Sequence, residues 1–556
     1  MQERFKPYEW SEEDRFYLEP FTSNLDGTIS VLRNLPPELT GALCSRASRA
    51  SKSLLRVLLD EYIYPIVHGE DKVLADELTG VVRFFHDHGF KNILNNQRAQ
   101  QFYTKWLAQY GDDSIAQMTG THLIFWGISQ VAMKFIEDQR IGLEPIEKST
   151  RYVSFAKKIP DVEENERYLY HIPEEELDEL GLRAEYEEVL NNLFDTYARL
   201  LPKLIEYLKT QYTESDSVLE KKAFDTLRGL LPMATLGQVA LRGNAQAFEY
   251  LINRTGKHEL SELARISRIV KTELDKEIPS LLLRSESEPS QQYQEYLALK
   301  RKRVKPFAEC VTEGKGMKAV SESSKSEVRL IEFDPQAPER ILAGILFGQS
   351  HLSWDACLTA ALAMSEQEKE EMFDRYLGHR KERWHKVGRA LENSYLRFEI
   401  TTDIGAYRDL HRHRMMTQER QYFSCHHGYA IPSEVQNAGL ELDYRAAMDR
   451  AAELFMKIEG ENPAVAQYVV PLGYKIRFYE WQNFRQFFWE VELRSTSQGH
   501  PEYRHVEHAK YWLVKEQFPL LTKHMKVDLQ EYGFARRGTE QKIQEKEAWL
   551  LEKLKK

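Results

Sequence analysis

The amino-acid sequence predicts an α+β protein built from two tandem units, each of which combines long amphipathic helices with a few strands. The chain has 556 residues, which is too long for one ordinary hydrophobic core, so two or more domains are expected. Four blocks of sequence recur in the same order in both halves, and this order indicates a tandem duplication. Within the blocks, short apolar runs with strand periodicity precede segments with helical periodicity.

The repeated blocks define the two units. Each unit begins with a short apolar run, a proline turn and an amphipathic helix, at 29–48 and at 328–350. The other three pairs are 121–140 with 394–414, 168–186 with 428–444, and 230–264 with 469–506. We therefore predict an N-terminal repeat at 1–285 and a C-terminal repeat at 327–556. The poorly periodic residues 286–326, rich in Ser, Glu and Lys, are the predicted linker.

Local patterns identify individual elements of the second unit. Leu396, Phe398 and Ile400 alternate with charged residues, which is typical of a half-buried strand. A helical segment follows from about Ile404. The aromatic run that begins at Phe484 has helical spacing and is expected to lie chiefly in the core.

Composition and charge exclude several classes of protein. Hydrophobic residues make up 42% of the chain and charged residues 29%, as in ordinary globular proteins. The formal net charge of -10 argues against general binding of nucleic acids or membrane surfaces, but it leaves room for a local anion pocket. The four cysteines are widely spaced, and we find neither a signal peptide nor an apolar run long enough for a membrane span. We therefore expect a cytoplasmic protein.

One short segment departs from this acidic average. Residues 411–424, HRHRMMTQERQYFS, contain three arginines and two histidines. Arginine holds phosphate oxygens in a bidentate manner and keeps its charge, and a histidine between two arginines can stack or form a hydrogen bond. Taken alone, such a segment is also typical of a solvated cationic helix end.

The context of this segment resembles the signature region of the flavin-dependent thymidylate synthases. In that family a strand and a helix lead into Arg-His-Arg, and a loop with Glu-x-Ser-x-Arg-Tyr follows. Residues 398–414 are similar to the first part, and EKSTRY at 147–152 is similar to the second. Further similar positions are Asn483, Arg485, Arg494 and 501–509 in the second half, and Arg228, Asn244, Arg254, His258 and Glu262 in the first. The resemblance covers most of both halves and implies a small, mostly antiparallel sheet in each.

Neither half keeps the whole signature. The second half keeps Arg412, His413 and Arg414 but has no clean Glu-x-Ser-x-Arg, whereas the first half shows the opposite loss. Departures from the family pattern are Asp112, Asp138, Gln139, Gln246, Asp409 and Gln467. In the family the pocket lies between subunits, and the losses here are complementary. We therefore predict a hybrid site, with one wall formed by Arg412, His413, Arg414, Asn483, Arg485 and Arg494 and the other by Glu147, Ser149, Arg151 and Arg228.

The resemblance also implies an activity, which is the conversion of dUMP to dTMP. Methylenetetrahydrofolate would donate the carbon, and FAD recharged by NADPH would deliver the hydride. FAD would be bound by Arg412, His413, Arg414, Asn483 and Arg485, and the nucleotide by Glu147, Ser149, Arg151 and Arg228. Arg494 would stabilise the negative charge that develops on the uracil ring. If the parent family assembles from four single-copy chains, this chain is expected to be a homodimer.

Other interpretations stay open at this point. The departures from the family pattern are compatible with a non-catalytic flavin- or nucleotide-binding homologue, or with a flavoenzyme acting on another pyrimidine nucleotide. Cys425, His426 and His427, together with His411 and His413, suggest a metal cluster, but their spacing matches no usual zinc pattern, so no metal site is predicted. We find no glycine-rich dinucleotide or phosphate loop in the sequence.

Overall fold

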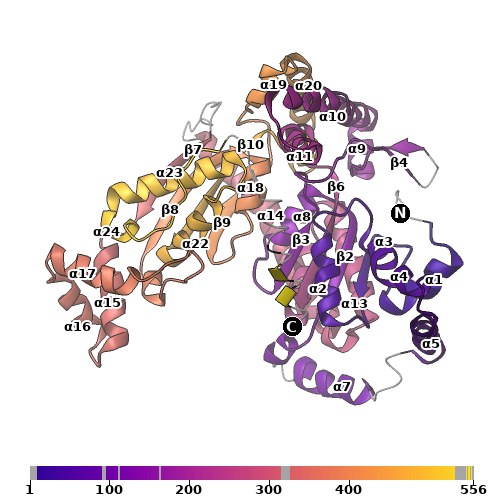
Figure 1. Cartoon of the computed structure of the whole chain (residues 1–556), viewed down its shortest axis with the longest axis horizontal. Coiled ribbons are helices and arrows are strands. Elements are labelled where there is room, and N and C mark those ends of the chain that lie inside the picture. Colours follow the sequence, from indigo (N-terminus) through magenta and orange to yellow (C-terminus); the bar gives the residue numbers. More distant parts are fainter. Residues whose placement is uncertain are drawn as a thin grey trace. The chain divides into compact units, whose positions relative to one another are not determined.

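The computed structural model describes residues 9–89, 96–109, 113–161, 165–314 and 326–532, and a few positions between 546 and 553. The chain forms two compact units. The first comprises Met1–Val320 and Ile431–Pro471, and the second comprises Ser321–Ala430 and Leu472–Lys556. Each unit contains helices and one four-stranded antiparallel sheet, so the predicted α+β class with two helix-rich units is confirmed (Figure 1).

The sheet of the first unit has the strand order β1-β2-β6-β3. Its strands are β1 Ile29–Leu32, β2 Gly120–Ser129, β3 Leu143–Glu147 and β6 Leu236–Asn244, and every neighbouring pair is antiparallel. The register shifts between Trp126 and Ile128, where Gly127 has a φ of 75°. Glycine adopts this conformation without the steric penalty that a side chain would add.

The sheet of the second unit repeats this topology in the order β7-β8-β10-β9. Its strands are β7 Glu327–Phe333, β8 Tyr395–Asp403, β9 Met416–Arg420 and β10 Lys475–Asn483. Leu396, Phe398 and Ile400 are completely buried in β8, which confirms the strand predicted from their alternation. The corresponding strands follow the same order along the sequence in both halves, which supports the proposed duplication.

The first half of the sequence contributes many helices to the first unit. They are α1 Glu12–Leu18, α2 Pro37–Arg46, α3 Leu54–Val57, α4 Tyr64–Val67, α5 Lys72–His88, α7 Asn96–Tyr103, α8 Gln130–Glu137, α9 Glu174–Leu180, α10 Arg183–Gln211, α11 Asp216–Leu227, α12 Ala245–Thr255, α13 Ser261–Asp275 and α14 Glu288–Gly314. Between α8 and α9 a short hairpin joins β4 Ile159–Pro160 to β5 Glu166–Arg167. Most of the described part of the predicted linker is therefore a helix, α14, which contacts α12.

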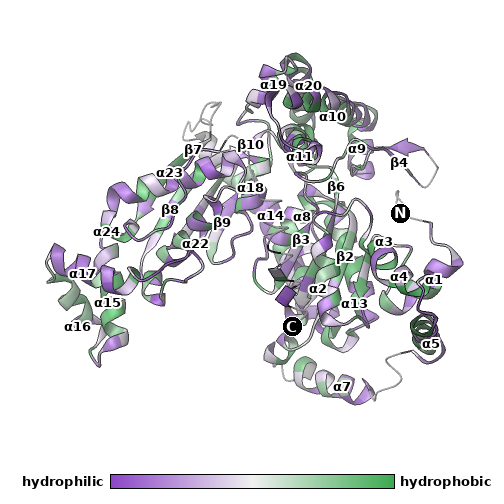
Figure 2. Cartoon of the chain, viewed as in Figure 1, coloured by the Kyte–Doolittle hydropathy of each residue, from purple (hydrophilic) through white to green (hydrophobic). Residues whose placement is uncertain are grey.

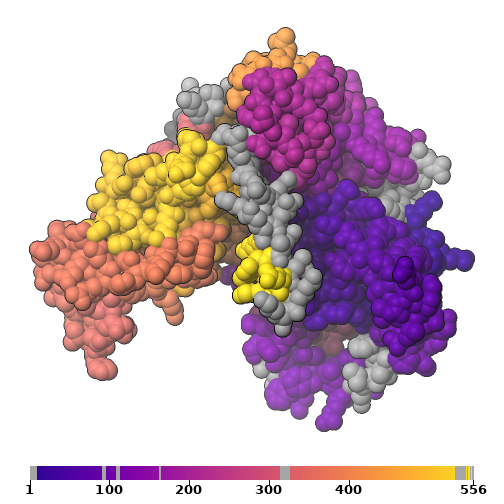
Figure 3. Space-filling model, in the orientation of Figure 1, coloured from indigo at the N-terminus to yellow at the C-terminus, as the bar shows by residue number. Residues whose placement is uncertain are grey.

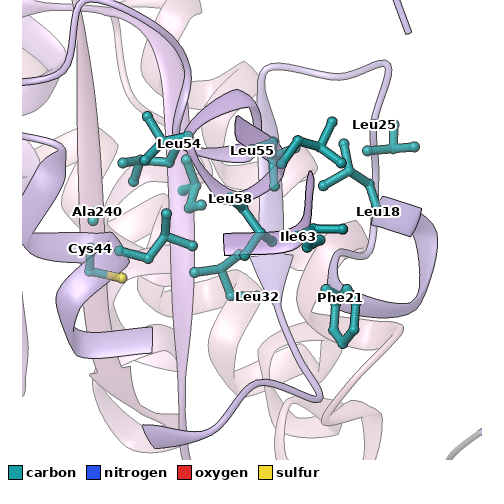
Figure 4. Packing of buried hydrophobic residues seen from close by; sticks show 14 of the residues in the cluster. Leu18, Phe21, Leu25, Leu32, Cys44, Leu54, Leu55, Leu58, Ile63 and Ala240 are labelled. Atoms are coloured by element: carbon teal, nitrogen blue, oxygen red, sulfur yellow. The ribbon is translucent and has the colours of Figure 1, made fainter. Parts of the chain in front are cut away.

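A hydrophobic cluster joins the N-terminal helices to the first sheet. Leu18 and Phe21 from the start of the chain, Leu54 and Leu58 from the region of α3, and Leu32 of β1 pack together (Figure 4). The cluster also includes Ile124 of β2 and Ala240 of β6, so the helices close over three neighbouring strands. Burial of this apolar surface is the main stabilising term for this layer.

The segment 431–471 from the second half of the sequence packs within the first unit. It forms α19 Ser433–Asn437, α20 Glu441–Glu459 and α21 Pro463–Ala466. Helix α20 lies against α10, its counterpart in the first half, and the two surfaces adjoin in the space-filling view (Figure 3). Tyr468 follows α21, and its hydroxyl donates to the buried carboxylate of Glu262 at 2.9 Å. The two halves thus share the packing of one compact unit.

The second unit has its own helices. They are α15 Ala337–Gln349, α16 Trp354–Leu362, α17 Glu366–Leu377, α18 Ile404–Leu410, α22 Phe484–Arg494, α23 Pro501–Gln517 and α24 Pro519–Thr522. Helices α22 and α23 pack along the sheet, and the aromatic face of α22 is buried as the sequence predicts. Helices α15, α16 and α17 form a separate lobe of this unit, and the colouring by hydropathy shows many apolar residues in α15 and α16 (Figure 2).

The described residues contain neither a membrane-spanning helix nor a metal-binding cluster. No helix among them is both long and apolar enough to cross a membrane. No group of three or more His, Cys, Asp or Glu side chains among them is arranged to hold a metal ion.

Candidate functional site

A cationic cavity of about 370 Å³ lies in the second unit. Its lining includes all five residues that the resemblance assigns to the flavin, which are Arg412, His413, Arg414, Asn483 and Arg485. The other lining residues are Arg380, Arg383, Lys386, Val387, Glu392, Met415, Gln486, Phe488, Trp489 and Glu492. The cavity therefore combines arginine and lysine side chains with two aromatic rings.

Two helix caps place the signature residues at this cavity. Asp403 ends β8 and its carboxylate accepts from the backbone N–H of Ala406, so α18 begins at a defined residue. The helix ends at Leu410, and Arg412 and Arg414 are exposed on the segment that follows it. In the same way Asn483 ends β10 and caps α22 through the backbone N–H of Gln486. Both residues are of the types that favour a helix N-cap.

His413 is buried between its two exposed arginine neighbours. Its Nε2 accepts from Arg494 Nε at 3.0 Å, and its Nδ1 lies 3.2 Å from the side-chain amide of Gln486. Arginine can only donate, so the proton of the neutral ring belongs on Nδ1, where the amide oxygen of Gln486 can accept it in the rotated orientation. Burial lowers the pKa of His413 to about 3, so the ring is neutral at pH 7. Arg494 does not line the cavity, and its visible role is to hold His413.

The segment between α17 and β8 supplies cations that the sequence analysis did not assign. Arg380 forms two hydrogen bonds with Glu492, at 2.9 and 2.6 Å, and both side chains are almost fully buried. Lys386 lies over the ring of Trp489, with its Nζ 5.0 Å from the centroid. The residues HRKERWHK at 379–386 are as rich in cations as the Arg-His-Arg segment, and this local charge was the only signal available in the sequence.

A fully buried charged cluster lies in the core of the same unit. Lys510 of α23 is 2.7 Å from Glu480, 2.8 Å from Glu490 and 3.4 Å from Glu507, and none of the four side chains is exposed. Gln418 donates to Glu480 at 3.0 Å. Glu490 also interacts electrostatically with His413, so the cluster adjoins the cavity lining. Three carboxylates face one ammonium group, and complete ionisation would leave excess negative charge in a low-dielectric core.

The protonation of this cluster differs from that of ordinary glutamates. Burial and the neighbouring Glu490 raise the pKa of Glu480 to about 7, although Lys510 opposes them. Burial also raises the pKa of Glu507 well above its usual value. For Glu490 the attraction of Lys510 outweighs burial, and its pKa lies below the usual value. The cluster therefore holds protons at neutral pH that an unfolded chain would release.

We expect the proton on Glu480 to make the stability of the second unit depend on pH, with stability falling as the pH rises. The folded state keeps the Glu480 proton up to about pH 7, whereas the unfolded state releases it near the ordinary glutamate pKa of 4.5. Because the folded state binds this proton more tightly than the unfolded state, Glu480 contributes stability at low pH. This contribution is lost as the pH rises to about 7. Glu480→Gln removes it, so the stability of wild type relative to this variant should fall by about 3 kcal/mol between pH 5 and pH 8. Urea unfolding across this range measures the difference.

Glu516→Gln is the matched control, since Glu516 is an exposed residue of α23. The stability difference between this control and wild type should stay constant with pH. A constant difference for Glu480→Gln as well would contradict the proposed protonation of the cluster.

In the first unit the predicted nucleotide residues lie at and after the end of β3. Glu147 ends the strand and pairs with the buried Lys134 of α8 at 3.2 Å. The hydroxyl of Ser149 accepts from the backbone N–H of Arg151 at 3.1 Å. Lys148, between Glu147 and Ser149 in the sequence, lies near the rings of Trp126 and Phe155, and burial lowers the pKa of Lys148 to about 8. The loop is therefore held by contacts of its own side chains.

Arg151 and Arg228 lie beside the same carboxylate. Both face Asp225 of α11. Arg151 binds it through two hydrogen bonds of 3.0 and 2.9 Å, and the Nε of Arg228 lies 3.5 Å from it. Within the described part of the chain, Nη2 of Arg228 is buried without a hydrogen-bond partner. The carboxylate of Asp225 thus stands where the resemblance expects a phosphate, and one buried donor is still unsatisfied.

The two sheets identify which residues are equivalent in the two halves. Ser129 caps α8 and Asp403 caps α18, so these two residues are equivalent. At equal intervals after the two caps, the first half has Asp138, Gln139 and Arg140, and the second half has Arg412, His413 and Arg414. Asn244 and Asn483 cap α12 and α22.

Asn244 ends β6 and Asn483 ends β10, so residues at the same distance before these two caps are equivalent in the two strands. Val239, which pairs with Glu147, corresponds to Phe478, which pairs with Arg420. Arg420 therefore stands in the place of Glu147. Arg140 and Asn244 match Arg414 and Asn483, so both halves keep these two positions, whereas Asp138, Gln139 and Arg420 mark positions at which the two halves differ.

The remaining departures from the family pattern have different surroundings. Asp409 lies 3.6 Å from Arg412 and so adds negative charge beside the cavity. Gln467, at the position of Arg228, donates to the carbonyl of Ala464. Gln139 donates to the carbonyl of Ala247. Asp112 lies outside the described residues.

Comparison with known proteins identifies the family to which the chain belongs. The family model described as "Thymidylate synthase complementing protein" matches residues 77–280 and 330–520, one segment in each half. A UPF0159 protein of Chlamydia pneumoniae is 35% identical over 515 residues, which cover 90% of this chain and 92% of that protein. A UPF0159 protein of Chlamydia muridarum is 34% identical over 512 residues with the same coverage. The UPF0159 protein Ta1429 of Thermoplasma acidophilum is 29% identical over 483 residues, covering 80% and 92%.

Among solved structures, the UMP/dUMP methylase PolB of Streptomyces cacaoi bound with 5-Br dUMP is similar to 38% of this chain and 100% of its own, with 13% identity and a TM-score of 0.30. The family model spans more than half of the chain, and two relatives are more than 30% identical over nine tenths of it. The chain therefore belongs to the thymidylate synthase complementing protein family.

Proposed function

We propose that the protein is a flavin-dependent thymidylate synthase, which converts dUMP to dTMP with methylenetetrahydrofolate, FAD and NADPH. The observation that carries this proposal is the convergence of Arg412, His413, Arg414, Asn483 and Arg485 on one cavity. These residues lie far apart in the sequence, and only the fold brings them together. Their side chains suit an anionic, aromatic ligand.

The residues of the cavity fit the chemistry of FAD. Arg412 and Arg414 are exposed and line the cavity, and guanidinium groups bind the oxygens of a pyrophosphate in a bidentate manner. Phe488 and Trp489 offer apolar ring surface in the same lining. When bound, the reduced flavin supplies the hydride, and the folate supplies the carbon.

The residues of the chain bind and orient the reactants. In the second unit the neutral His413 keeps Arg494 in a fixed orientation, and Asn483 holds the start of α22. In the first unit Arg151 and Arg228 would bind the nucleotide phosphate, with the unsatisfied Nη2 of Arg228 as one donor. The proposal that Arg494 acts on the uracil ring and the proposal of a hybrid site both rest on the resemblance, as does the homodimer.

One observation favours a second candidate. Asp225 already forms an ion pair with Arg151. To bind a phosphate, Arg151 would have to give up this carboxylate. This carboxylate is compatible with a flavin-binding homologue that lacks the thymidylate reaction, or with a flavoenzyme acting on another pyrimidine nucleotide.

An assay of proton release from C5 of dUMP separates the candidates. The chain is reconstituted with FAD and supplied with NADPH and methylenetetrahydrofolate, and solvent exchange of the C5 proton is followed together with dTMP formation. We expect both signals, and we expect Arg151→Met to abolish them while leaving the bound flavin in place. Asp225→Asn is the matched variant, because it frees both arginines without removing a cation. Bound flavin with no proton release in wild type, but release in Asp225→Asn, would overturn the proposal in favour of the second candidate.

A further inference from the structure

The cavity of the second unit carries more positive charge than the flavin-binding signature accounts for. The signature contributes Arg412, Arg414 and Arg485, and Arg485 pairs with Glu392 at 2.5 Å. The segment 378–388 adds Arg380, Arg383 and Lys386 to the same lining. Neither the Arg-His-Arg segment nor the Asn-x-Arg segment explains these three residues.

Arg380 is the anchor of this segment and not a ligand-binding group. Its guanidinium is committed to Glu492, and its Nε donates to the carbonyl of His385 at 2.6 Å. A second nitrogen lies 3.4 Å from the carbonyl of Arg383. The backbone N–H of Lys526 also donates to Glu492, at 3.0 Å. The backbone of the segment is therefore fixed, so a ligand that binds to Arg383 and Lys386 would not have to order this backbone.

Arg383 and Lys386 are the cations that remain available. In the described part of the chain, neither side chain pairs with a carboxylate. Lys386 instead lies over Trp489, whose ring also lines the cavity. An ammonium group over an aromatic ring, with a guanidinium group in the same lining, is suited to a phosphate carried on a nucleoside, since the ring can stack and the cations can bind the oxygens.

We infer that Arg383 and Lys386 form a second phosphate-binding point in this cavity, which recognises a phosphomonoester dianion separate from the flavin pyrophosphate. The inference rests on the proposed function only in assigning the flavin to Arg412 and Arg414. The phosphomonoester has two possible sources: the ribose 2′-phosphate of a dinucleotide reductant, or the 5′-phosphate of the pyrimidine nucleotide, which would then bind here instead of at Arg151 and Arg228. Trp489 would contact the nucleoside in either case.

Calorimetric titration of the full-length, FAD-reconstituted chain tests this inference. The probes are adenosine 2′,5′-bisphosphate against 5′-AMP, and dUMP against deoxyuridine. In wild type one phosphorylated probe should bind more tightly than its counterpart. The double variant Arg383→Met/Lys386→Met should weaken that probe by about tenfold to a hundredfold, the loss expected for one or two charge-assisted hydrogen bonds. Lys381→Met is the matched control, since Lys381 is an exposed cation of the same segment outside the lining and should keep wild-type affinity.

The outcomes separate this inference from the proposed function. Loss of affinity for the bisphosphate identifies the dinucleotide as the source, and loss for dUMP identifies the mononucleotide. Equal affinity of the double variant and Lys381→Met for both phosphorylated probes would overturn the inference, even with flavin bound. If the chain takes up no FAD but the double variant still loses affinity, the inference stands and the proposed function fails.

Discussion

Replacing Lys510 by methionine is expected to unfold the second unit or leave it barely stable. Lys510 is the cation that faces three buried glutamates, and none of the four side chains is exposed. Methionine fills a similar volume but leaves the carboxylates without their counter-charge. Removing one partner from a buried ion pair costs about 3–5 kcal/mol, which is a large part of the stability of a typical domain.

Urea unfolding followed by circular dichroism measures this loss, and limited proteolysis shows which unit opens. Lys515→Met is the matched control, since Lys515 is an exposed residue of the same helix and should behave as wild type. Adding Glu480→Gln and Glu490→Gln to Lys510→Met should recover much of the stability, because the uncompensated charges are then removed together. A Lys510→Met protein as stable as the Lys515→Met control would show that the cluster does not depend on this charge.

The second large effect is expected on flavin binding. The double variant Arg412→Met/Arg414→Met should be purified without flavin, because these two exposed guanidinium groups of the cavity are the proposed partners of the pyrophosphate. Each charge-assisted hydrogen bond contributes about 1.5–3 kcal/mol, so loss of both corresponds to about a thousandfold weaker binding. The ratio of released flavin to protein, and the affinity on reconstitution, measure the effect.

Arg375→Met serves as the control for this experiment. Arg375 is an exposed arginine of α17 in the same unit, pairs with Glu371 and does not line the cavity. Both proteins should have the far-ultraviolet circular dichroism of wild type. Wild-type flavin content in the double variant would contradict the assignment of the cavity to FAD, and with it the main support for the proposed function.

The two halves of the chain keep different parts of the signature that the family resemblance identifies. Arg420 stands where Glu147 stands in the other sheet, and Asp138 and Gln139 stand where Arg412 and His413 do. Random decay would not be expected to spare complementary positions. The partly buried Asp225 beside Arg151 and Arg228 is the feature that most directly tests whether these two arginines bind a phosphate.

Much of the local structure could be predicted because neighbouring residues carry the signal. The alternation of Leu396, Phe398 and Ile400 predicts β8, since period-two burial occurs only in a strand. The helical segment predicted from Ile404 corresponds to α18, and the aromatic spacing from Phe484 predicts the buried face of α22. The residues assigned to the flavin were found through their resemblance to a motif, and the structure brings all five to one cavity.

Other features left no local signal. Lys510 and Glu480 are charged residues in an acidic chain, and nothing in their sequence surroundings distinguishes a buried pair from an exposed one. Asp225 lies far from Arg151 in the sequence, so its bidentate contact depends on how α11 packs beside the loop after β3. The segment 378–388 is charged, but its place in the cavity depends on the contact between Arg380 and Glu492.

Periodicity predicted the α+β class, repeated blocks predicted two units, and motif residues indicated a cationic site, because all three signals come from residues close together in the chain. The folded chain alone reveals that residues 431–471 pack within the first unit, that Asp225 pairs with Arg151, and that Arg383 and Lys386 line the cavity. Burial and charge pairing depend on which distant segments meet in space, and no local pattern in this chain specifies those contacts.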